Sequence, residues 1–202
     1  MATARRDIEA PGSTSDRYEA IAEAARLCFE QWGVQRTRMD DIAKRAGVPR
    51  PALYRYFASK DALVMEVMVR HIRARAGQLH RRVPLKGPAG PLILKALLTG
   101  IVEPPGDRVS ETVLGFDVVH DTARLVGESD AVFDAMRDYW RPYLEYARDR
   151  GELRDGVDLD QAVRWLTLVV FYILAVPEVA PPRRDLATYL KTFVVDAVVP
   201  PR

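Results

Sequence analysis

Apolar residues along this chain recur at spacings of three and four, and few segments keep a strict alternation of apolar and polar residues. That spacing places apolar side chains on one face of a helix, whereas a half-buried strand needs a period of two. Prolines and glycines mark the breaks between the periodic segments. The pattern predicts an all-α protein of about nine helices.

The first predicted helix spans about residues 16–32 and ends at Gly33. A second helix, over about residues 38–46, follows Thr37, whose side chain is of a type that caps helices. Gly47 then provides the left-handed residue that lets the chain turn. The stripe expected to be buried on the first helix comprises Ile21, Ala24, Ala25, Cys28 and Phe29.

The third helix is predicted to begin at Pro49 or Arg50 and to end at Phe57. Prolines are tolerated in this first turn because its N–H groups have no intrahelical partner. A residue before proline avoids the helical region, so Arg50 has either the cap or the helical conformation. Ser59 is expected to cap a fourth, longer helix that continues to about Arg82.

The proline- and glycine-rich stretch Val83–Pro91 cannot continue the fourth helix. We expect a larger helical body after it. Asp158 with Gln161 three residues later forms a capping-box pattern, which marks the start of one of its helices. The helices expected in the body span about residues 92–102, 109–126, 131–150, 159–176 and 184–198.

The segment TRMDDIAKRAGVPRPALYRYFASK, residues 37–60, carries a charge of +4, while the whole chain carries only +2. Two short helices joined by a glycine turn, with basic residues on the second, fit the major groove of DNA. Arg50 and Arg55 are candidate base readers because arginine donates two hydrogen bonds to guanine. By charge alone, a solvated surface explains these residues equally well.

The stretch from Tyr18 to Met68 resembles the N-terminal domain of TetR-family transcriptional regulators. The resemblance rests on Asp-Ile-Ala-Lys-Arg-Ala-Gly-Val through the second helix and turn, Leu-Tyr-Arg-Tyr-Phe in the third helix, and Ser-Lys-Asp-Ala-Leu after it. Pro49 departs from the family, which commonly has a serine or threonine cap there. By this resemblance Arg50, Ala52 and Arg55 face bases, and the contacts to the DNA backbone come from Thr37, Arg38, Tyr54, Tyr56 and Lys60.

The resemblance also implies the domain organisation and the partners. Residues 1–15 would be a flexible tail, residues 16–62 a helix-turn-helix DNA-binding domain, and residues 63–202 an effector-binding and dimerisation body. A homodimer would bind a palindromic double-stranded operator, because a twofold dimer spans two half-sites. We expect a repressor that a small apolar or aromatic effector releases from its operator, although the sequence does not distinguish a repressor from an activator.

The middle of the body contains polar and aromatic residues at helical spacing, which could line an effector pocket. Packing of the same rings into an ordinary core is an equally good interpretation. Asp117, His120 and Asp121 could also be metal ligands, but the chain has only three histidines and no second cluster, so no metal is expected. The candidate pocket residues are Phe116, Asp117, His120, Phe133, Trp140 and Tyr143.

The last two predicted helices are apolar over more than one narrow stripe, which is typical of helices buried on two sides. An internal core accounts for part of this pattern. By resemblance to the family, their outer faces would pair with a second copy. The candidate interface residues are Trp165, Val169, Tyr172, Tyr189 and Phe193.

An all-helical enzyme and a protein-binding adaptor, each with an accessory DNA-binding domain, are the competing interpretations. No nucleophile with a base at recognisable spacing and no glycine-rich phosphate loop is found, so we expect no catalytic residues and no cofactor. The single cysteine, Cys28, suits a reducing compartment. The longest predominantly apolar stretch, residues 165–176, is too short to cross a bilayer. We therefore expect a cytoplasmic protein.

Overall fold

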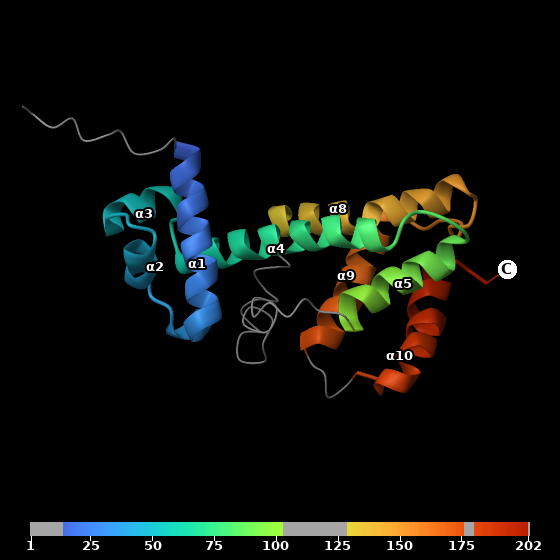
Figure 1. Cartoon of the computed structure of the whole chain (residues 1–202). Coiled ribbons are helices and arrows are strands. Elements are labelled where there is room, and N and C mark those ends of the chain that lie inside the picture. The colour runs from blue at the N-terminus through green and yellow to red at the C-terminus, as the bar shows by residue number, and fades with distance from the viewer. Residues whose placement is uncertain (1–13, 103–128, 176–179, 202) are drawn as a thin grey trace, which may run out of the picture.

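Two groups of helices, joined by one long helix, make up the part of the chain that the computed structural model describes, residues 14–102, 129–175 and 180–201. The first group lies at one end of an elongated molecule and the second lies at the other (Figure 1). Every regular element in these ranges is helical, which confirms the all-α prediction. No described helix combines the length and apolar character needed to cross a membrane.

The first group contains α1 (Thr14–Arg36), α2 (Met39–Arg45) and α3 (Arg50–Tyr56). The stripe predicted for the first helix is confirmed, since its five residues are at most 4% exposed. As predicted, Gly33 interrupts the regular helix. The chain kinks there, with φ at 80° and ψ at 158°, and a further short helical stretch follows to Arg36. Glycine adopts this non-helical conformation at little cost, so the first helix stops at Gly33 and the short stretch after it is a separate turn of helix.

Helix α4 (Lys60–Arg82) belongs to both groups. As predicted, Ser59 caps it, accepting a hydrogen bond from the Ala62 N–H at 3.1 Å. Its first half packs into the hydrophobic core of α1–α3, and its last two turns place Ala76 and Leu79 in the core of the body. A displacement of α4 relative to the body therefore moves the first group.

The body contains α5 (Ala89–Val102), α8 (Asp130–Asp149), α9 (Leu159–Ala175) and α10 (Arg183–Leu190). Helix α8 runs alongside α4 (Figure 1). Helix α5 begins three residues before its predicted start at residue 92, because Pro91 falls in its first turn, where proline is tolerated. The helix predicted over residues 109–126 lies outside the described residues, as do residues 1–13 of the tail predicted over residues 1–15, whereas residues 14 and 15 belong to α1.

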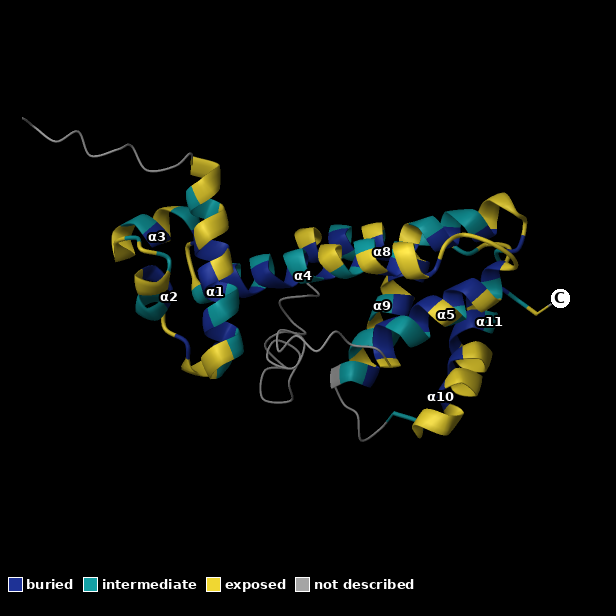
Figure 2. Cartoon of the chain, in the orientation of Figure 1, coloured by how far each residue is buried: buried dark blue, intermediate teal, exposed yellow. Residues whose placement is uncertain are grey.

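The end of the chain departs from the single helix predicted over residues 184–198. After α10 comes a π-helical turn, η3 (Lys191–Val195), and then a short α11 (Asp196–Val198). Within it the Asp196 N–H bonds to the Lys191 carbonyl, five residues back. The turn puts Val194 and Val195 in the core and leaves Phe193 exposed. Exposed residues cover much of the α10 ribbon at this end of the molecule (Figure 2).

The connector between α8 and α9 anchors two other parts of the body. The Glu152 carboxylate, 8% exposed, accepts a hydrogen bond from the Ala89 N–H at 2.6 Å and so holds the start of α5. The Arg154 guanidinium donates to the carbonyls of Asp196 at 2.6 Å and Ala197 at 2.9 Å, at the end of the last helix. Asp158 accepts from the Gln161 N–H at 2.9 Å, which confirms the predicted cap of α9.

Candidate nucleic-acid interface

Helices α2 and α3 form a helix-turn-helix around Gly47. Ala46 ends α2, and Gly47 has φ at 67°, in the left-handed region that glycine adopts without strain. The turn closes with the Val48 N–H bonded to the Ala43 carbonyl at 3.0 Å. This is the C-terminal glycine motif that the sequence predicted, and it lets α3 cross α2.

The structure settles where α3 begins. Pro49 takes the cap position with ψ at 143°, and its carbonyl accepts the first helical bonds, from Ala52 at 2.9 Å and Leu53 at 3.1 Å. Arg50 is therefore the first helical residue, and Pro51 occupies the next position, where its missing N–H removes no bond.

Helix α3 has one buried and one open face. Leu53 is fully buried and Phe57, just after the helix, is 4% exposed and stacks on the Tyr18 ring of α1 with ring centroids 4.7 Å apart. Arg50, Tyr54 and Arg55 are exposed, whereas Ala52 and Tyr56 are half-buried. The buried anchor fixes how the helix sits on the three-helix unit, so the exposed residues face outward from it.

Thr37 does not have the predicted place at the start of α2. The residue that caps α2 is Arg38, whose N–H bonds to the Asp41 carboxylate at 3.0 Å. The Thr37 side chain is 1% exposed, and its hydroxyl donates to the Gly33 carbonyl at 2.7 Å. The kink at Gly33 brings that carbonyl within reach, so Thr37 secures the α1–α2 connection and its hydroxyl is not free for a phosphate.

Lys60 also has a structural task that the sequence did not indicate. Its ammonium lies 3.0 Å from the Val34 carbonyl oxygen and 3.4 Å from those of Gln35 and Thr37. These carbonyls lie at the end of α1, where they lack helical partners. A phosphate contact by Lys60 would require some of these bonds to lengthen.

Arg50, in contrast with Arg55, is already held in place. Its Nε and Nη1 lie 3.1 and 3.3 Å from the two carboxylate oxygens of Asp40 on α2, and its guanidinium lies over the Tyr54 ring. The Tyr54 hydroxyl and then the Asp40 carboxylate raise the pKa of Arg50 above its ordinary value. Sequence reasoning missed Asp40, because only the crossing of α2 and α3 brings residues 40 and 50 together.

The predicted effector-pocket residues that the structure describes divide into core and surface. Trp140 and Tyr143 are each 1% exposed and belong to the core of the body, and the Tyr143 hydroxyl donates to the Val83 carbonyl at 2.9 Å. Phe133 is half-buried beneath the Arg164 guanidinium, 3.9 Å from its centroid. Trp140 and Tyr143 thus pack in the core, and their role in an effector pocket stays a prediction. Phe116, Asp117 and His120 lie outside the described residues.

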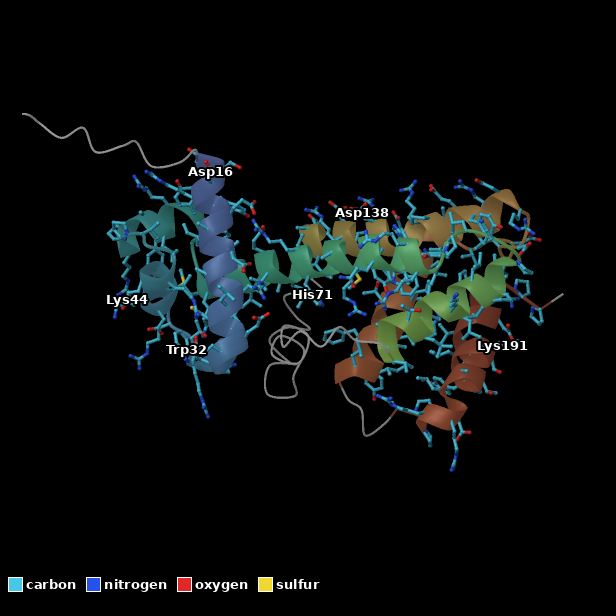
Figure 3. All side chains as sticks on the ribbon, in the orientation of Figure 1. Asp16, Trp32, Lys44, His71, Asp138 and Lys191 are labelled. Carbon is cyan, nitrogen blue, oxygen red and sulfur yellow. The ribbon has the colours of Figure 1, made fainter. Side chains whose placement is uncertain are left out.

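A groove of about 610 Å³ lies instead between α5, η3 and the end of the chain. Its apolar lining includes Leu94, Leu98 and Val195, and Lys95 and Lys191 also line it. Lys191 lies at the opposite end of the molecule from Lys44 of α2 (Figure 3).

Large apolar side chains are exposed on α9 and on the α10–η3 segment. Leu168 is 59% exposed, Tyr172 53% and Phe193 62%. Monomeric proteins rarely expose several large apolar side chains together. Trp165 and Tyr189 are each about two-fifths exposed, and Val169 is half-buried. We call the exposed set Trp165, Leu168, Tyr172, Tyr189 and Phe193 the aromatic surface.

These features define the class of the protein: a helix-turn-helix DNA-binding protein with a helical body. Residues 21–67 match the family described as bacterial regulatory proteins, tetR family. The chain is 28% identical over 160 residues to the HTH-type transcriptional repressor KstR2 of Rhodococcus jostii, covering 77% of this chain and 76% of that one. It is 45% identical over 57 residues to the transcriptional activator FasR of Mycolicibacterium smegmatis, covering 28% and 26%.

The fold extends the likeness beyond the matched domain. The crystal structure of RolR in complex with resorcinol superposes with a TM-score of 0.70 at 14% identity, covering 91% of this chain and 88% of that one. The chain belongs to the TetR family of transcriptional regulators. It is a DNA-binding regulator and not an enzyme.

Proposed function

We propose that this regulator is a cytoplasmic homodimeric repressor that binds a palindromic operator and is released by a small apolar or aromatic effector. The observation that carries the proposal is helix α3. It is anchored by Leu53 and Phe57 and presents Arg50, Tyr54 and Arg55 outward at the end of the molecule.

The proposed division of roles follows the positions of these side chains. Recognition helices contact base edges from their N-terminal residues, which favours Arg50 and Ala52, with Arg55 one turn further along. Arg38, Tyr54 and Tyr56 would hold phosphates and so fix the orientation of the unit. Lys60 would act mainly through the carbonyls of the α1–α2 connection.

The aromatic surface supports the homodimer. One helix-turn-helix reads only a few base pairs, and two copies related by a twofold axis read half-sites about one helical turn apart. Burial of exposed rings such as Tyr172 and Phe193 is favourable at roughly 25 cal/mol per Å² of apolar area. We therefore propose that α9 and α10 of two copies pack together.

Helix α4 supports effector control. Because it lies in both cores, an effector that favours one arrangement of the body would change the position of α3 relative to its copy. Arg70 of α4 ties this helix to the DNA-binding unit through the Glu19 carboxylate of α1, at 2.6 and 2.9 Å, and it also lies over the Tyr18 ring. The effector can shift DNA affinity only by its differential affinity for the two arrangements.

The test begins with selection of bound DNA from a random pool by the purified protein. A palindrome with two equivalent half-sites is expected. Enrichment of no sequence would contradict sequence-specific binding, and a single unrepeated half-site would contradict the dimer. A reporter gene placed behind the selected operator would then show lower expression when the regulator is present, whereas higher expression would identify an activator.

Effector release needs a separate measurement. Fluorescence anisotropy of the labelled operator would be followed while apolar and aromatic small molecules are added. A compound that dissociates the complex should also raise the melting temperature of the free protein, because it binds the folded state. Compounds that stabilise the protein without changing operator affinity would count against effector control.

A further inference from the structure

The Arg50 guanidinium is held by groups from two different helices. Asp40 contacts it through both carboxylate oxygens, and the ring centroid of Tyr54 lies 5.7 Å from the guanidinium carbon. The Arg55 side chain makes no hydrogen bond or ion pair with the described residues. Of the two arginines proposed to read bases, only Arg50 is paired with protein groups of the described residues before DNA arrives.

The pair lies where α3 would enter the major groove. Asp40 is in the first turn of α2, and Arg50 is the first residue of α3. In a helix-turn-helix, base edges are met by the N-terminal residues of the second helix. Asp40 therefore acts on the arginine that is nearest the groove.

The ion pair is too weak to keep Arg50 from DNA. Its side chains are 60% and 47% exposed, and exposed pairs contribute little to stability because water screens them. Its effect is on orientation, since a long arginine side chain otherwise samples many rotamers. The guanidinium has five N–H donors, so the contacts with Asp40 leave donors for a base.

We propose that Asp40 is a positioning residue that aims Arg50 at one base pair in each half-site and so sets the specificity at that position. This inference rests on the proposed function, in which Arg50 reads a base. Asp40 also carries a negative charge close to DNA phosphates, so it weakens binding to every sequence. The carboxylate thus lowers general affinity while it increases discrimination at one base pair.

The experiment compares DNA selections by the full-length wild-type protein and by Asp40→Asn, Arg50→Ala and the double variant. Asp61→Asn is the matched control, because it removes an exposed carboxylate of the same unit, whereas the ion pair and the hydrogen bond of Arg50 go to Asp40. Urea unfolding of each variant establishes that all are folded. Discrimination is measured as the ratio of affinities for the selected operator and for operators changed at one base pair.

Arg50→Ala should reduce discrimination at one base pair by about tenfold. Asp40→Asn should reduce it at the same base pair by about threefold to fivefold and leave the other positions unchanged. The double variant should match Arg50→Ala, because Asp40 acts only through Arg50. Asp40→Asn and Asp61→Asn should both raise affinity for random DNA by about twofold.

Three results would overturn the proposal. Asp40→Asn could change every base pair equally, as the control does, or it could still reduce discrimination when Arg50 is absent. Arg50→Ala could also leave every preference intact, which would remove Arg50 from base reading while the protein remains a specific DNA binder. Failure of the wild-type protein to select any sequence would instead reject the proposed function itself.

Discussion

The two ends of this molecule have the same kind of interior but expose different chemistry. Both cores are aliphatic and aromatic, with Leu53 and Phe29 fully buried at one end and Leu144 and Trp140 at the other. The N-terminal end exposes guanidinium groups around α3, whereas the C-terminal end exposes the aromatic surface. The two regions therefore differ in the side chains that they expose to solvent and not in the kind of residues that they bury.

This difference indicates how each end finds its partner. Charged groups remain well hydrated and attract phosphates over a distance that depends on salt. Large rings gain free energy only when another apolar surface covers them, at short range. The N-terminal end is thus suited to reversible binding of DNA, and the C-terminal end to a stable association with another protein surface.

The largest expected effect concerns Trp140, which the sequence placed in a pocket and the structure places in the core. Trp140→Ala should lower the free energy of unfolding by about 3–5 kcal/mol, because it leaves a cavity. Urea denaturation would measure this. A loss below about 1 kcal/mol would show that the ring lines an open space after all. Arg141→Ala, at the exposed neighbouring position, is the control.

Phe193→Asp tests the aromatic surface. A charge in the centre of an apolar interface should dissociate the dimer and weaken operator binding by about 100-fold, since each copy then binds alone. Sedimentation velocity and operator titration would measure the two effects. Thr188→Asp places the same charge at an exposed polar position of α10 and should change neither. If the Phe193→Asp protein remained dimeric, the dimer interface would have to lie on another surface.

Tyr143 gives the core of the body a pH dependence. Burial raises its pKa to about 12 from an ordinary value of 10.0. The unfolded chain loses this proton near pH 10 while the folded protein keeps it, so the free energy of unfolding should fall as the pH rises from 10 to 12. The fall is at most about 2–3 kcal/mol.

Tyr143→Phe isolates this effect. It loses the hydrogen bond to the Val83 carbonyl, which costs about 1 kcal/mol at neutral pH. Its stability should then decline less steeply than that of the wild type above pH 10, measured by urea unfolding in a series of buffers. If the free energy of unfolding fell equally steeply with pH in both proteins, the pKa of Tyr143 would be the same in the folded and the unfolded state. Tyr18 titrates in both proteins and cancels from the comparison.

The smallest effects separate two cations of the N-terminal end. Arg55→Ala should weaken operator binding about tenfold and leave stability unchanged, because its side chain is exposed and makes no hydrogen bond or ion pair with the described residues. Lys60→Met should lower the free energy of unfolding by about 1 kcal/mol, because the end of α1 loses its donor. Operator titration and urea unfolding of both variants would measure the two effects. A loss of stability in Arg55→Ala, or a loss of operator affinity alone in Lys60→Met, would contradict this assignment.

Helix positions followed closely from the sequence where the signals were local. Ser59 and Asp158 cap the helices that were predicted to follow them, because a cap needs only residues within the same turn. Gly47 was predicted for the same reason. Gly33 was also predicted to end the first helix, and its backbone is non-helical, but the short helical stretch that follows it to Arg36 was not predicted.

The partners of polar side chains were beyond the reach of the sequence. Thr37 had the residue type of a cap, but the kink at Gly33 placed a nearer carbonyl beside its hydroxyl. Lys60 had the charge of a phosphate ligand, but the fold brought it to the carbonyls that end α1. Trp140 and Tyr143 had the spacing of either a pocket or a core, and only the packing of α8 against α4 and α5 decided for the core.

The sequence by itself determined the all-α fold, the helix-turn-helix motif and the family, because periodicity, caps and an ordered motif are written within short stretches of chain. Tertiary structure alone decided which guanidinium is held by Asp40, which aromatic rings are covered and which remain in water. Those outcomes depend on distances between residues that are far apart in the chain. They are set by how helices cross, which no local pattern records.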